Sequence, residues 1–364
     1  MRLEVEAALV DGVLVPGDVE IDDGVVTGVG LPVGDGKGIA APGFIDLQVN
    51  GFAGVDFLDA DAGDYETAGE ALLETGVTSF LPTFITSSPD VLCEALGVLA
   101  QLQGSGPRVL GAHLEGPFIS PARLGVHPAA WRRDPDLELL DRLLGAGPVR
   151  VMTIAPELPG GPELVDALAA AGVTVSLGHT DATADEARAA FAQGATAVTH
   201  LFNAMRPLGH REPGLAGAAL TTPAVTVQVI ADRVHVADDV LRLVATAAPG
   251  RFSLVTDAMA GARMPDGLYR LADVEVTVAG GVARRGDGAL AGSVLTMDEA
   301  VRNLARLGVA LEPALTAATA APASILGLTD VGRLAVGLPA DIVVLDEHLE
   351  VSRVLIGGVE RVAL

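Results

Sequence analysis

The stretch Val109-Leu110-Gly111-Ala112-His113-Leu114-Glu115-Gly116-Pro117-Phe118 contains the pattern that decides the fold. A short apolar run, typical of a buried strand, ends in a His and a Glu, and Gly and Pro then stop the strand. Because side chains alternate along a strand, His113 and Glu115 point the same way. A carboxylate at the end of a buried strand is how α/β enzymes present a ligand to a pocket. The alternative is that neighbouring backbone groups satisfy both side chains.

Short apolar runs of this kind recur along the chain, and amphipathic or alanine-rich segments separate most of them. The runs cover residues 44–49, 78–84, 109–115, 150–156, 174–179, 196–201, 225–231 and 252–257. The helical segments cover residues 63–75, 88–102, 135–145, 162–172, 182–193 and 237–248. Eight strand–helix units predict an α/β fold of the (β/α)8 TIM-like barrel type. The count of eight disfavours a doubly wound open sheet.

Both ends of the chain have β character, with Asp-Gly turns near the start that signal hairpins. We expect residues 1–42 and 335–364 to form one small β-sandwich domain, with the barrel, residues 43–334, inserted between them. After the eighth strand, residues 268–288 return to β character, and we expect a hairpin there that could contribute to the small domain. Two helices are predicted after it, at 296–308 and 311–326.

The composition limits the classes of partner. Half of the 364 residues are apolar and 19% are charged, which indicates a compact globular enzyme. A net charge of −24 argues against nucleic acid and anionic membranes as partners. Cys93 is the single cysteine, so no intrachain disulfide can form and a cytoplasmic location is expected. The N-terminus lacks an apolar signal segment, and the longest uncharged run, 213–231, is predicted to be a loop followed by a strand.

Histidines gather where the predicted strands end or in the loops after them. Six of the seven do so: His113, His127, His179, His200, His210 and His235. Histidines that only fill a core would scatter more evenly, so this clustering favours a functional site.

Active sites of barrel enzymes form at the C-terminal ends of the strands, where Glu115, His179 and His200 would converge. One carboxylate and two imidazoles make a three-ligand set for a catalytic divalent metal with an open position for water. Such a metal lowers the pKa of bound water to about 7. Asp257, across the barrel mouth, is then placed to take the proton and later deliver it to a leaving group. Each residue alone could be a satisfied core residue, but all four at strand ends favour the site.

Several sequence blocks resemble the N-acetylglucosamine-6-phosphate deacetylases of the amidohydrolase superfamily, over most of the chain from residue 42 to 341. They are His113-Leu114-Glu115-Gly116-Pro117-Phe118, Gly178-His179-Thr180, Thr199-His200-Leu201-Phe202-Asn203-Ala204-Met205, Arg211-Glu212-Pro213-Gly214, Thr256-Asp257-Ala258 and Leu290-Ala291-Gly292-Ser293. The His-Leu-Glu-Gly-Pro and Phe-Asn-Ala-Met blocks are the most specific. The resemblance implies hydrolysis of the acetamide of N-acetylglucosamine 6-phosphate, a small amino-sugar phosphate, by a homodimer with a barrel and a β-sandwich.

The resemblance also implies a role for individual residues. Glu115, His179 and His200 would hold one divalent metal per subunit, for which zinc is the first expectation and iron, cobalt or manganese are alternatives. Asp257 would be the catalytic acid and base, and His127 would help to polarise the substrate carbonyl. The sugar-phosphate contacts would be Asn203, Ala204, Arg211 and His235, and Arg211 and His235 could act across the dimer interface. The alternative for Arg211 is a surface salt bridge with Glu212.

Two departures from the wider superfamily bear on the metal count. Many amidohydrolases have His-x-His at the end of the first strand, but this chain has Gln48 and Asn50. Amides are poor metal ligands, so these residues mark an absent or weak second site. The only lysine is Lys37, in the N-terminal unit, so a carboxylated lysine that bridges two metals cannot form. His113, one layer deeper in the barrel, is expected to orient the ligands by hydrogen bonds.

The sequence is also compatible with two other functions. A related deacetylase could prefer the galactosamine epimer or a non-phosphorylated sugar, since an epimer changes only a few hydrogen bonds. A protein of a different class, a non-catalytic barrel that binds sugar phosphates, would be expected to have lost Asp257 or metal ligands. All four of these residues are present.

Overall fold

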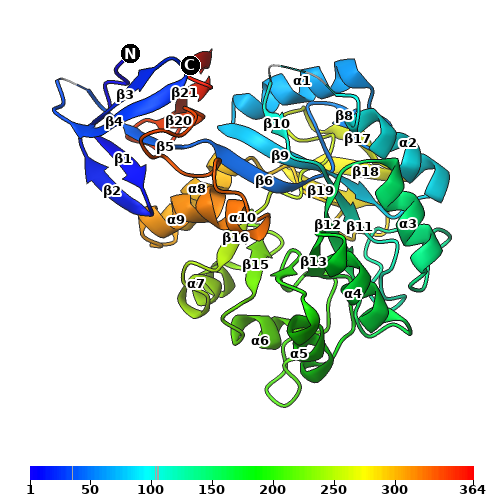
Figure 1. Cartoon of the computed structure of the whole chain (residues 1–364). Helices are drawn as coiled ribbons and strands as arrows, with labels where there is room; N and C mark the ends of the chain where they lie inside the picture. Colours follow the sequence, from blue (N-terminus) through cyan, green and yellow to red (C-terminus); the bar gives the residue numbers. More distant parts are fainter. Residues whose placement is uncertain (35, 103, 105) are drawn as a thin grey trace.

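Eight parallel strands form the centre of the computed structural model, which describes residues 1–34, 36–102, 104 and 106–364 (Figure 1). They are β6 (Phe44–Val49), β9 (Val77–Ile85), β11 (Ala112–Glu115), β12 (Val149–Ile154), β13 (Thr174–Leu177), β14 (Ala197–Val198), β15 (Thr226–Val229) and β16 (Phe252–Leu254). Each strand pairs with the next in this order. A parallel bridge between Val49 and Ala258 brings the last strand back to the first. The predicted (β/α)8 barrel is therefore confirmed.

Helices cover the outside of the barrel. They are α1 (Ala62–Leu73), α2 (Pro89–Leu99), α3 (Leu137–Ala146), α4 (Gly161–Ala170), α5 (Ala184–Gln193), α6 (Gly214–Leu220), α7 (Asp238–Ala247), α8 (Met297–Arg306), α9 (Leu311–Ala318) and α10 (Ala320–Ile325). Local sequence explains where some begin. At α5, the Thr183 side chain accepts from the Glu186 N–H and the Glu186 carboxylate accepts from the Thr183 N–H, a capping box. No helix among the described residues is both long enough and apolar enough to span a membrane.

The structure differs from the predicted elements in three places. The run predicted at 109–115 is split into β10 (Arg108–Val109) and β11, because Gly111 between them has φ +126° and a Cβ there would lie 2.7 Å from the Pro148 carbonyl oxygen. The loop predicted within 213–231 contains α6, whose small apolar residues are nearly all buried. The single helix predicted at 311–326 is divided at Thr319 into α9 and α10.

Both chain ends meet in a small β-sandwich, as the fold prediction required (Figure 1). A six-stranded sheet has the order β2 (Val13–Pro16), β1 (Ala7–Val10), β5 (Ile39–Pro42), β20 (Ile342–Leu345), β21 (Val351–Ile356) and β22 (Val359–Ala363). The second sheet pairs β3 (Asp18–Asp22) with β4 (Val25–Leu31). Both sheets contribute to one apolar cluster, which includes Ala8, Val19 and Ile342. We propose domain boundaries of 1–42 with 335–364, and 43–334; residue 35 lies outside the described residues.

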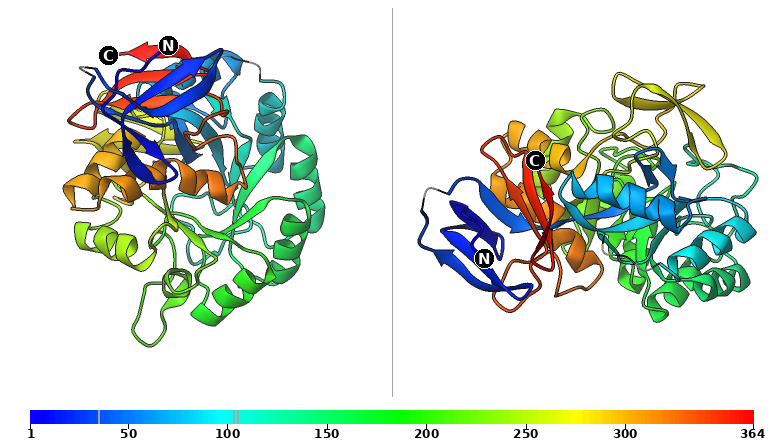
Figure 2. Two further views of the ribbon diagram at one scale, coloured as in Figure 1. Left: turned by 60° about the vertical axis from the view of Figure 1, so that its left-hand side comes forward. Right: turned by 90° about the horizontal axis from the view of Figure 1, so that it is seen from above.

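The excursion after β16 forms a three-stranded antiparallel sheet of β17 (Gly267–Leu271), β18 (Val274–Ala279) and β19 (Val282–Arg285). Val276 and Val278 of β18 are buried in an apolar cluster with Ile85, the last residue of β9, and Val126 of a barrel loop. The sheet therefore packs against the barrel and lies away from the sandwich (Figure 2). The expected contribution of 268–288 to the small domain was wrong, because the apolar face of β18 covers the barrel side that carries the candidate site.

Candidate metal and active site

Three strand ends of the barrel carry polar side chains on strained backbone. His179 follows β13, His200 follows β14 and Asp257 follows β16, with φ of +47°, +26° and +52°. Non-glycine residues in this left-handed region each cost about 1–3 kcal/mol and persist only where the surroundings hold them. Such residues gather at functional sites, so their recurrence at one end of the barrel marks that end as the candidate site.

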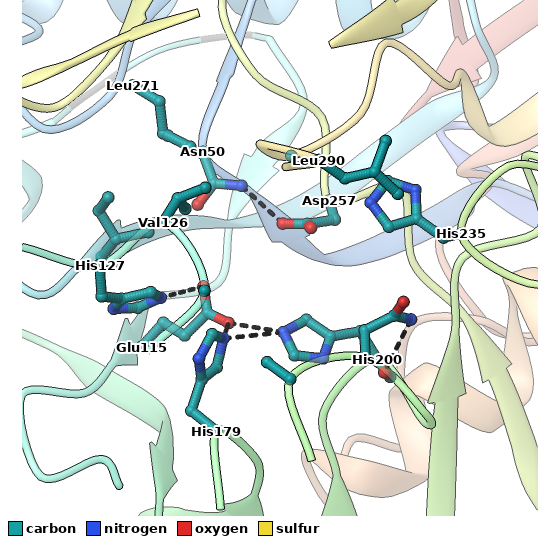
Figure 3. A pocket seen from close by; sticks show the side chains of 15 residues that line it. Asn50, Glu115, Val126, His127, His179, His200, His235, Asp257, Leu271 and Leu290 are labelled. Atoms are coloured by element: carbon teal, nitrogen blue, oxygen red, sulfur yellow. Dashed lines mark hydrogen bonds and ion pairs between the residues drawn. The ribbon is translucent and has the colours of Figure 1, made fainter. Parts of the chain in front are cut away.

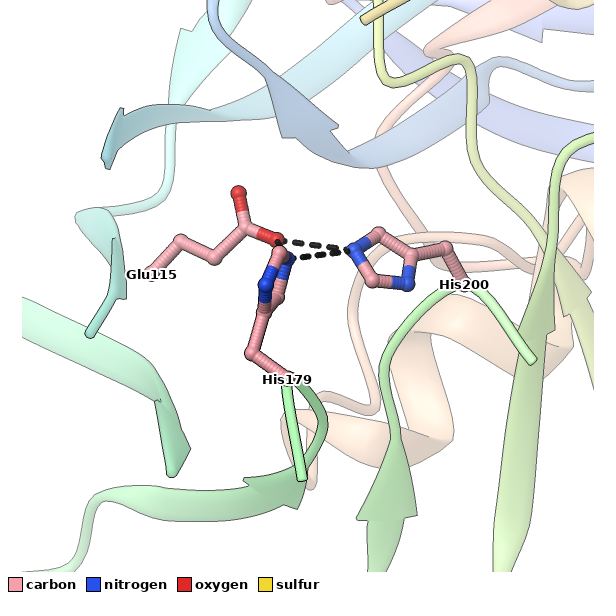
Figure 4. A group of neighbouring side chains, drawn as sticks. All are labelled: Glu115, His179 and His200. Carbon is pink, nitrogen blue, oxygen red and sulfur yellow. Dashed lines mark hydrogen bonds and ion pairs between the residues drawn. The ribbon is translucent and has the colours of Figure 1, made fainter. Parts of the chain in front are cut away.

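Glu115, His179 and His200 converge as the sequence predicted (Figure 4). Glu115 Oε1 lies 2.8 Å from His200 Nε2 and 3.0 Å from His179 Nε2, and the two Nε2 atoms are 3.2 Å apart. All three side chains are buried. Within the described residues, this is the one group of three or more His, Cys, Asp or Glu residues whose ligand atoms lie close enough together to hold a metal ion.

The chemistry of these atoms fits a cation. His179 Nδ1 lies 2.8 Å from the Arg123 carbonyl oxygen, which can only accept, so Nδ1 carries the proton and Nε2 has a free lone pair. That lone pair faces a second imidazole nitrogen and a carboxylate oxygen. Although burial opposes it, the neighbouring imidazoles of His127, His179 and His200 hold the pKa of Glu115 well below its usual value. An ionised carboxylate and two imidazoles are a donor set for a divalent transition metal.

His127 lies beside this group as a neutral imidazole. Burial, with the neighbouring His179, lowers the pKa of His127 to about 4. Its Nδ1 accepts from the Thr86 N–H at 3.3 Å and lies 2.9 Å from Thr86 Oγ1. The proton is therefore on Nε2, which lies 3.7 Å from Glu115 Oε2. His127 thus offers an N–H donor to the pocket, and Thr86, which the sequence did not single out, sets its tautomer.

Asp257 faces the ligand group from the opposite wall (Figure 3). Its Oδ1 accepts from Asn50 Nδ2 at 2.7 Å and from Gln48 Nε2 at 3.2 Å. Burial, with the nearby Glu115 carboxylate, raises the pKa of Asp257 to about 6. The two amides expected to mark a vestigial metal site therefore hold the carboxylate expected to move protons.

One pocket contains most of the predicted substrate contacts (Figure 3). It is lined by Asn50, Ile85, Glu115, Gly125, Val126, His127, His179, His200, Asn203, Ala204, His235, Asp257, Leu271, Leu290 and Gly292. His235 Nδ1 donates to Asp232 Oδ2 at 2.6 Å, which leaves its Nε2 for a ligand. The Asn203 side-chain N–H groups bond to the His200 and Leu201 carbonyl oxygens, so this residue also shapes its own loop.

Arg211 does not reach this pocket within one chain. Residues 205–213 form a projecting loop beside α5 and α6, and both His210 and Arg211 are exposed on it (Figure 1). The alternative salt bridge with Glu212 is not present, because the Glu212 carboxylate accepts from the Ala184 and Gly214 N–H groups. His235 is half-buried in the pocket, whereas His210 and Arg211 are exposed on the loop, so the three residues do not form one cationic patch.

His113 lies deeper in the barrel, fully buried. Its Nδ1 donates to the Leu47 carbonyl oxygen at 3.0 Å and its Nε2 lies 2.7 Å from Thr153 Oγ1. Thr153 Oγ1 is 2.7 Å from Thr199 Oγ1, next in sequence to His200. Neither Leu47 nor Thr153 is a candidate metal ligand, so His113 supports the strands below the site and is linked to His200 through the Thr153 and Thr199 hydroxyls.

The apolar wall of the pocket was not predicted. Leu271, at the end of β17, lies in the pocket with Ile85 and Val126 because the excursion sheet packs over the barrel end. No local pattern in the sequence indicates this contact.

Asp46 is a second residue that the sequence analysis did not single out, although a carboxylate within an apolar strand was a signal for it. The strand is fully buried, and the Asp46 side chain accepts from Thr256 Oγ1 at 2.6 Å.

Comparison with known proteins agrees with this geometry. A model of the amidohydrolase family matches residues 39–360. The chain is 42% identical over 340 residues to N-acetylglucosamine-6-phosphate deacetylase of Homo sapiens, covering 89% of this chain and 83% of that protein. It is 39% identical over 352 residues to N-acetylgalactosamine-6-phosphate deacetylase of Escherichia coli O157:H7, covering 93% of each.

Solved structures give the same result. A mutant N-acetyl-D-glucosamine-6-phosphate deacetylase from Mycobacterium smegmatis, in complex with N-acetyl-D-glucosamine-6-phosphate, matches with a TM-score of 0.95 at 38% identity, over 100% of this chain and 99% of that chain. The corresponding enzyme from Thermotoga maritima matches with a TM-score of 0.92 at 33% identity, over 100% of each chain. The chain belongs to the amidohydrolase family, in the group of N-acetylglucosamine-6-phosphate deacetylases.

Proposed function

We propose that this protein hydrolyses the acetamide of N-acetylglucosamine 6-phosphate to glucosamine 6-phosphate and acetate. The observation that carries the proposal is the convergence of Glu115, His179 and His200 in one pocket with Asp257. The activity named for the relatives and the substrate in the Mycobacterium smegmatis complex support it.

In this proposal Glu115, His179 and His200 hold one divalent metal, which would lower the pKa of a bound water and polarise the acetamide oxygen. Asp257 takes a proton as the water oxygen adds to the carbonyl carbon. It then gives a proton to the nitrogen as the carbon–nitrogen bond breaks, so that acetate and the free amine are formed. His127, neutral and with its proton on Nε2, donates to the oxygen where negative charge develops.

The finer assignments follow from the same site. Asn203, Ala204 and His235 line the pocket and are proposed to contact the sugar phosphate. Arg211 is proposed to contact the phosphate of the substrate bound in the neighbouring subunit of a homodimer. A guanidinium binds phosphate well, and the Arg211 side chain is exposed on a projecting loop. Zinc is our proposed metal, because two imidazoles and a carboxylate suit it, with iron, cobalt or manganese as alternatives. The single cysteine favours the reducing cytoplasm as its compartment.

A second substrate has a specific observation in its favour. The Escherichia coli O157:H7 relative, which is named for N-acetylgalactosamine 6-phosphate, aligns over 93% of this chain at 39% identity. The two sugars differ by one hydroxyl epimer, so the same metal group and the same proton transfers would serve both.

The experiment is a comparison of kcat/KM for four substrates: the two N-acetyl amino-sugar 6-phosphates and their unphosphorylated forms. We expect the glucosamine-derived phosphate to have the highest value. A higher value for the galactosamine-derived phosphate would replace it as the substrate. Equal values with and without phosphate would contradict the phosphate contacts assigned to Arg211 and His235.

A further inference from the structure

A cluster of charged side chains at the rim of the site meets at Asp181, two residues after His179. Arg123 donates to Asp181 Oδ1 from Nε at 2.8 Å and from Nη2 at 2.7 Å. Arg206 donates from Nη2 to Asp181 Oδ2 at 2.7 Å and from Nε to the Asp181 carbonyl oxygen at 2.8 Å. Both carboxylate oxygens of Asp181 therefore accept charge-assisted hydrogen bonds from guanidinium groups, Oδ1 from Arg123 and Oδ2 from Arg206.

The three residues come from three different loops of the barrel. Arg123 lies in the loop after β11, Asp181 in the loop after β13 and Arg206 in the loop after β14. The same loops supply pocket residues: Gly125 and His127 from the first, His179 from the second, and Asn203 and Ala204 from the third. Asp181 thus ties together the three loops that form this side of the pocket.

The cluster reaches His179 through the main chain of Arg123. The His179 Nδ1–H donates to the Arg123 carbonyl oxygen at 2.8 Å, while the Ser120 N–H donates to the His179 carbonyl oxygen at 2.8 Å. Arg123 therefore binds Asp181 through its side chain and fixes the imidazole plane of His179 through its main-chain carbonyl. This contact keeps Nε2 free of a proton, as metal binding requires.

The backbone of His179 needs such support. Its φ of +47° is unfavourable for a residue with a side chain and is kept only by constraints from outside. Directly after it, the Thr180 hydroxyl and the Asp181 N–H both donate to the Glu157 carboxylate, the latter at 2.7 Å. The charges of Arg123 and Arg206 balance those of Asp181 and Glu157, so these half-buried residues add no net charge beside His179.

We propose that Asp181, with Arg123 and Arg206, is a positioning residue that holds the His179 imidazole in its metal-binding orientation through the carbonyl of Arg123. The inference rests on the metal group of the proposed function and adds residues that do not touch the metal or the substrate. Loss of a residue that orients a metal ligand costs about 10- to 100-fold in metal affinity.

The test is titration of the metal-free protein with Co²⁺, followed by the visible absorption bands of the bound ion. Arg123→Ala removes the grip on Asp181 but keeps the main-chain carbonyl. We expect it to bind Co²⁺ about 10- to 100-fold more weakly and with an altered band shape. Asp181→Asn is expected to act in the same direction. The double variant should lose no more affinity than the weaker-binding single variant, because both changes break one path.

Glu360→Gln is the matched control, since it removes a carboxylate held by Arg353 on the small domain at 2.6 Å, away from the site. It should bind Co²⁺ like the unaltered protein. Unchanged Co²⁺ affinity and band shape in Arg123→Ala would overturn the proposal, as would additive losses in the double variant. If Asp181→Asn does not fold, Arg123→Ala alone decides. If the unaltered protein does not bind Co²⁺, the proposed metal site itself is wrong. If the unaltered protein and Arg123→Ala bind Co²⁺ equally well, only the positioning role is wrong.

Discussion

The Asn50 side-chain amide donates to Asp257 Oδ1 at 2.7 Å, across 207 positions of sequence. The end of the first barrel strand is therefore used here to hold a carboxylate, and Gln48 adds a second, longer hydrogen bond of 3.2 Å. Because these bonds stabilise the ionised form of Asp257, they favour the state that accepts a proton.

We expect Asn50→Leu to lower kcat by about 10- to 100-fold, since a hydrogen bond to a charged group contributes roughly 1.5–3 kcal/mol. The acid limb of the kcat/KM profile should also move to higher pH, because the carboxylate loses a donor. Gln48→Leu should give a smaller shift of the same sign. An unchanged acid limb in both variants would contradict the role of these amides.

The unaltered enzyme should lose activity as the pH falls. Asp257 must be ionised to take a proton, and burial together with the Glu115 carboxylate raises its pKa to about 6. The value of kcat/KM should therefore be at its maximum well above this pKa and fall as the pH decreases through it. A bound cation would lower the pKa of this carboxylate, so the acid limb of kcat/KM is expected at or below about 6. A limb above pH 7, measured with saturating metal, would exclude Asp257 as the base.

Asp46 should make the protein less stable as the pH rises. Burial raises the pKa of Asp46 to about 7, against a hydrogen bond from the Thr256 hydroxyl that lowers it. The unfolded chain ionises near pH 4 and the folded chain only near 7, so stability is lost between these values. Asp46→Asn has no carboxyl at this position to ionise. The free energy of unfolding of the variant minus that of the unaltered protein should therefore increase by roughly 3–4 kcal/mol between pH 4 and 7.

Asp18 is the control for this prediction, because its pKa is shifted in the opposite direction. Burial would raise its pKa, but the hydrogen bonds from Arg2, Val5 and Val19 outweigh burial and lower it. Asp18→Asn should therefore lose stability relative to the unaltered protein as the pH rises through the range where this carboxylate ionises. Urea unfolding at several pH values measures both differences. Parallel pH curves for Asp46→Asn and the unaltered protein would contradict the raised pKa, because they would show that the Asp46 carboxyl has the same pKa in the folded and the unfolded chain.

Arg211 should act in trans. Asp257→Asn and Arg211→Ala are each expected to be nearly inactive alone on the phosphorylated sugar. Unfolded and refolded together in equal amounts, they should recover about a quarter of the activity, since half of the dimers are mixed and each has one complete site. Activity that stays at the level of the single variants would contradict the proposed dimer contact.

The sequence predicted the convergence of Glu115, His179 and His200 because the C-terminal ends of parallel strands meet wherever a barrel closes. It could not predict the left-handed backbone of His179, which depends on contacts from loops distant in sequence. Helix α6 was missed because its buried Ala and Gly residues lack the apolar–polar period of a surface helix. Leu271 lines the pocket because the whole sheet of β17, β18 and β19 packs against the barrel, and no local sequence pattern predicts that packing.

The most direct test counts the metal and the product in one preparation. Protein freed of metal by a chelator should release no acetate from N-acetylglucosamine 6-phosphate. Activity should rise with added zinc and reach its maximum at one equivalent per chain, with one acetate formed for each glucosamine 6-phosphate. Asp257→Asn should bind the same equivalent and lose about 10²–10⁴ in kcat. No acetate release with one metal bound, or a maximum that requires two equivalents, would contradict the account.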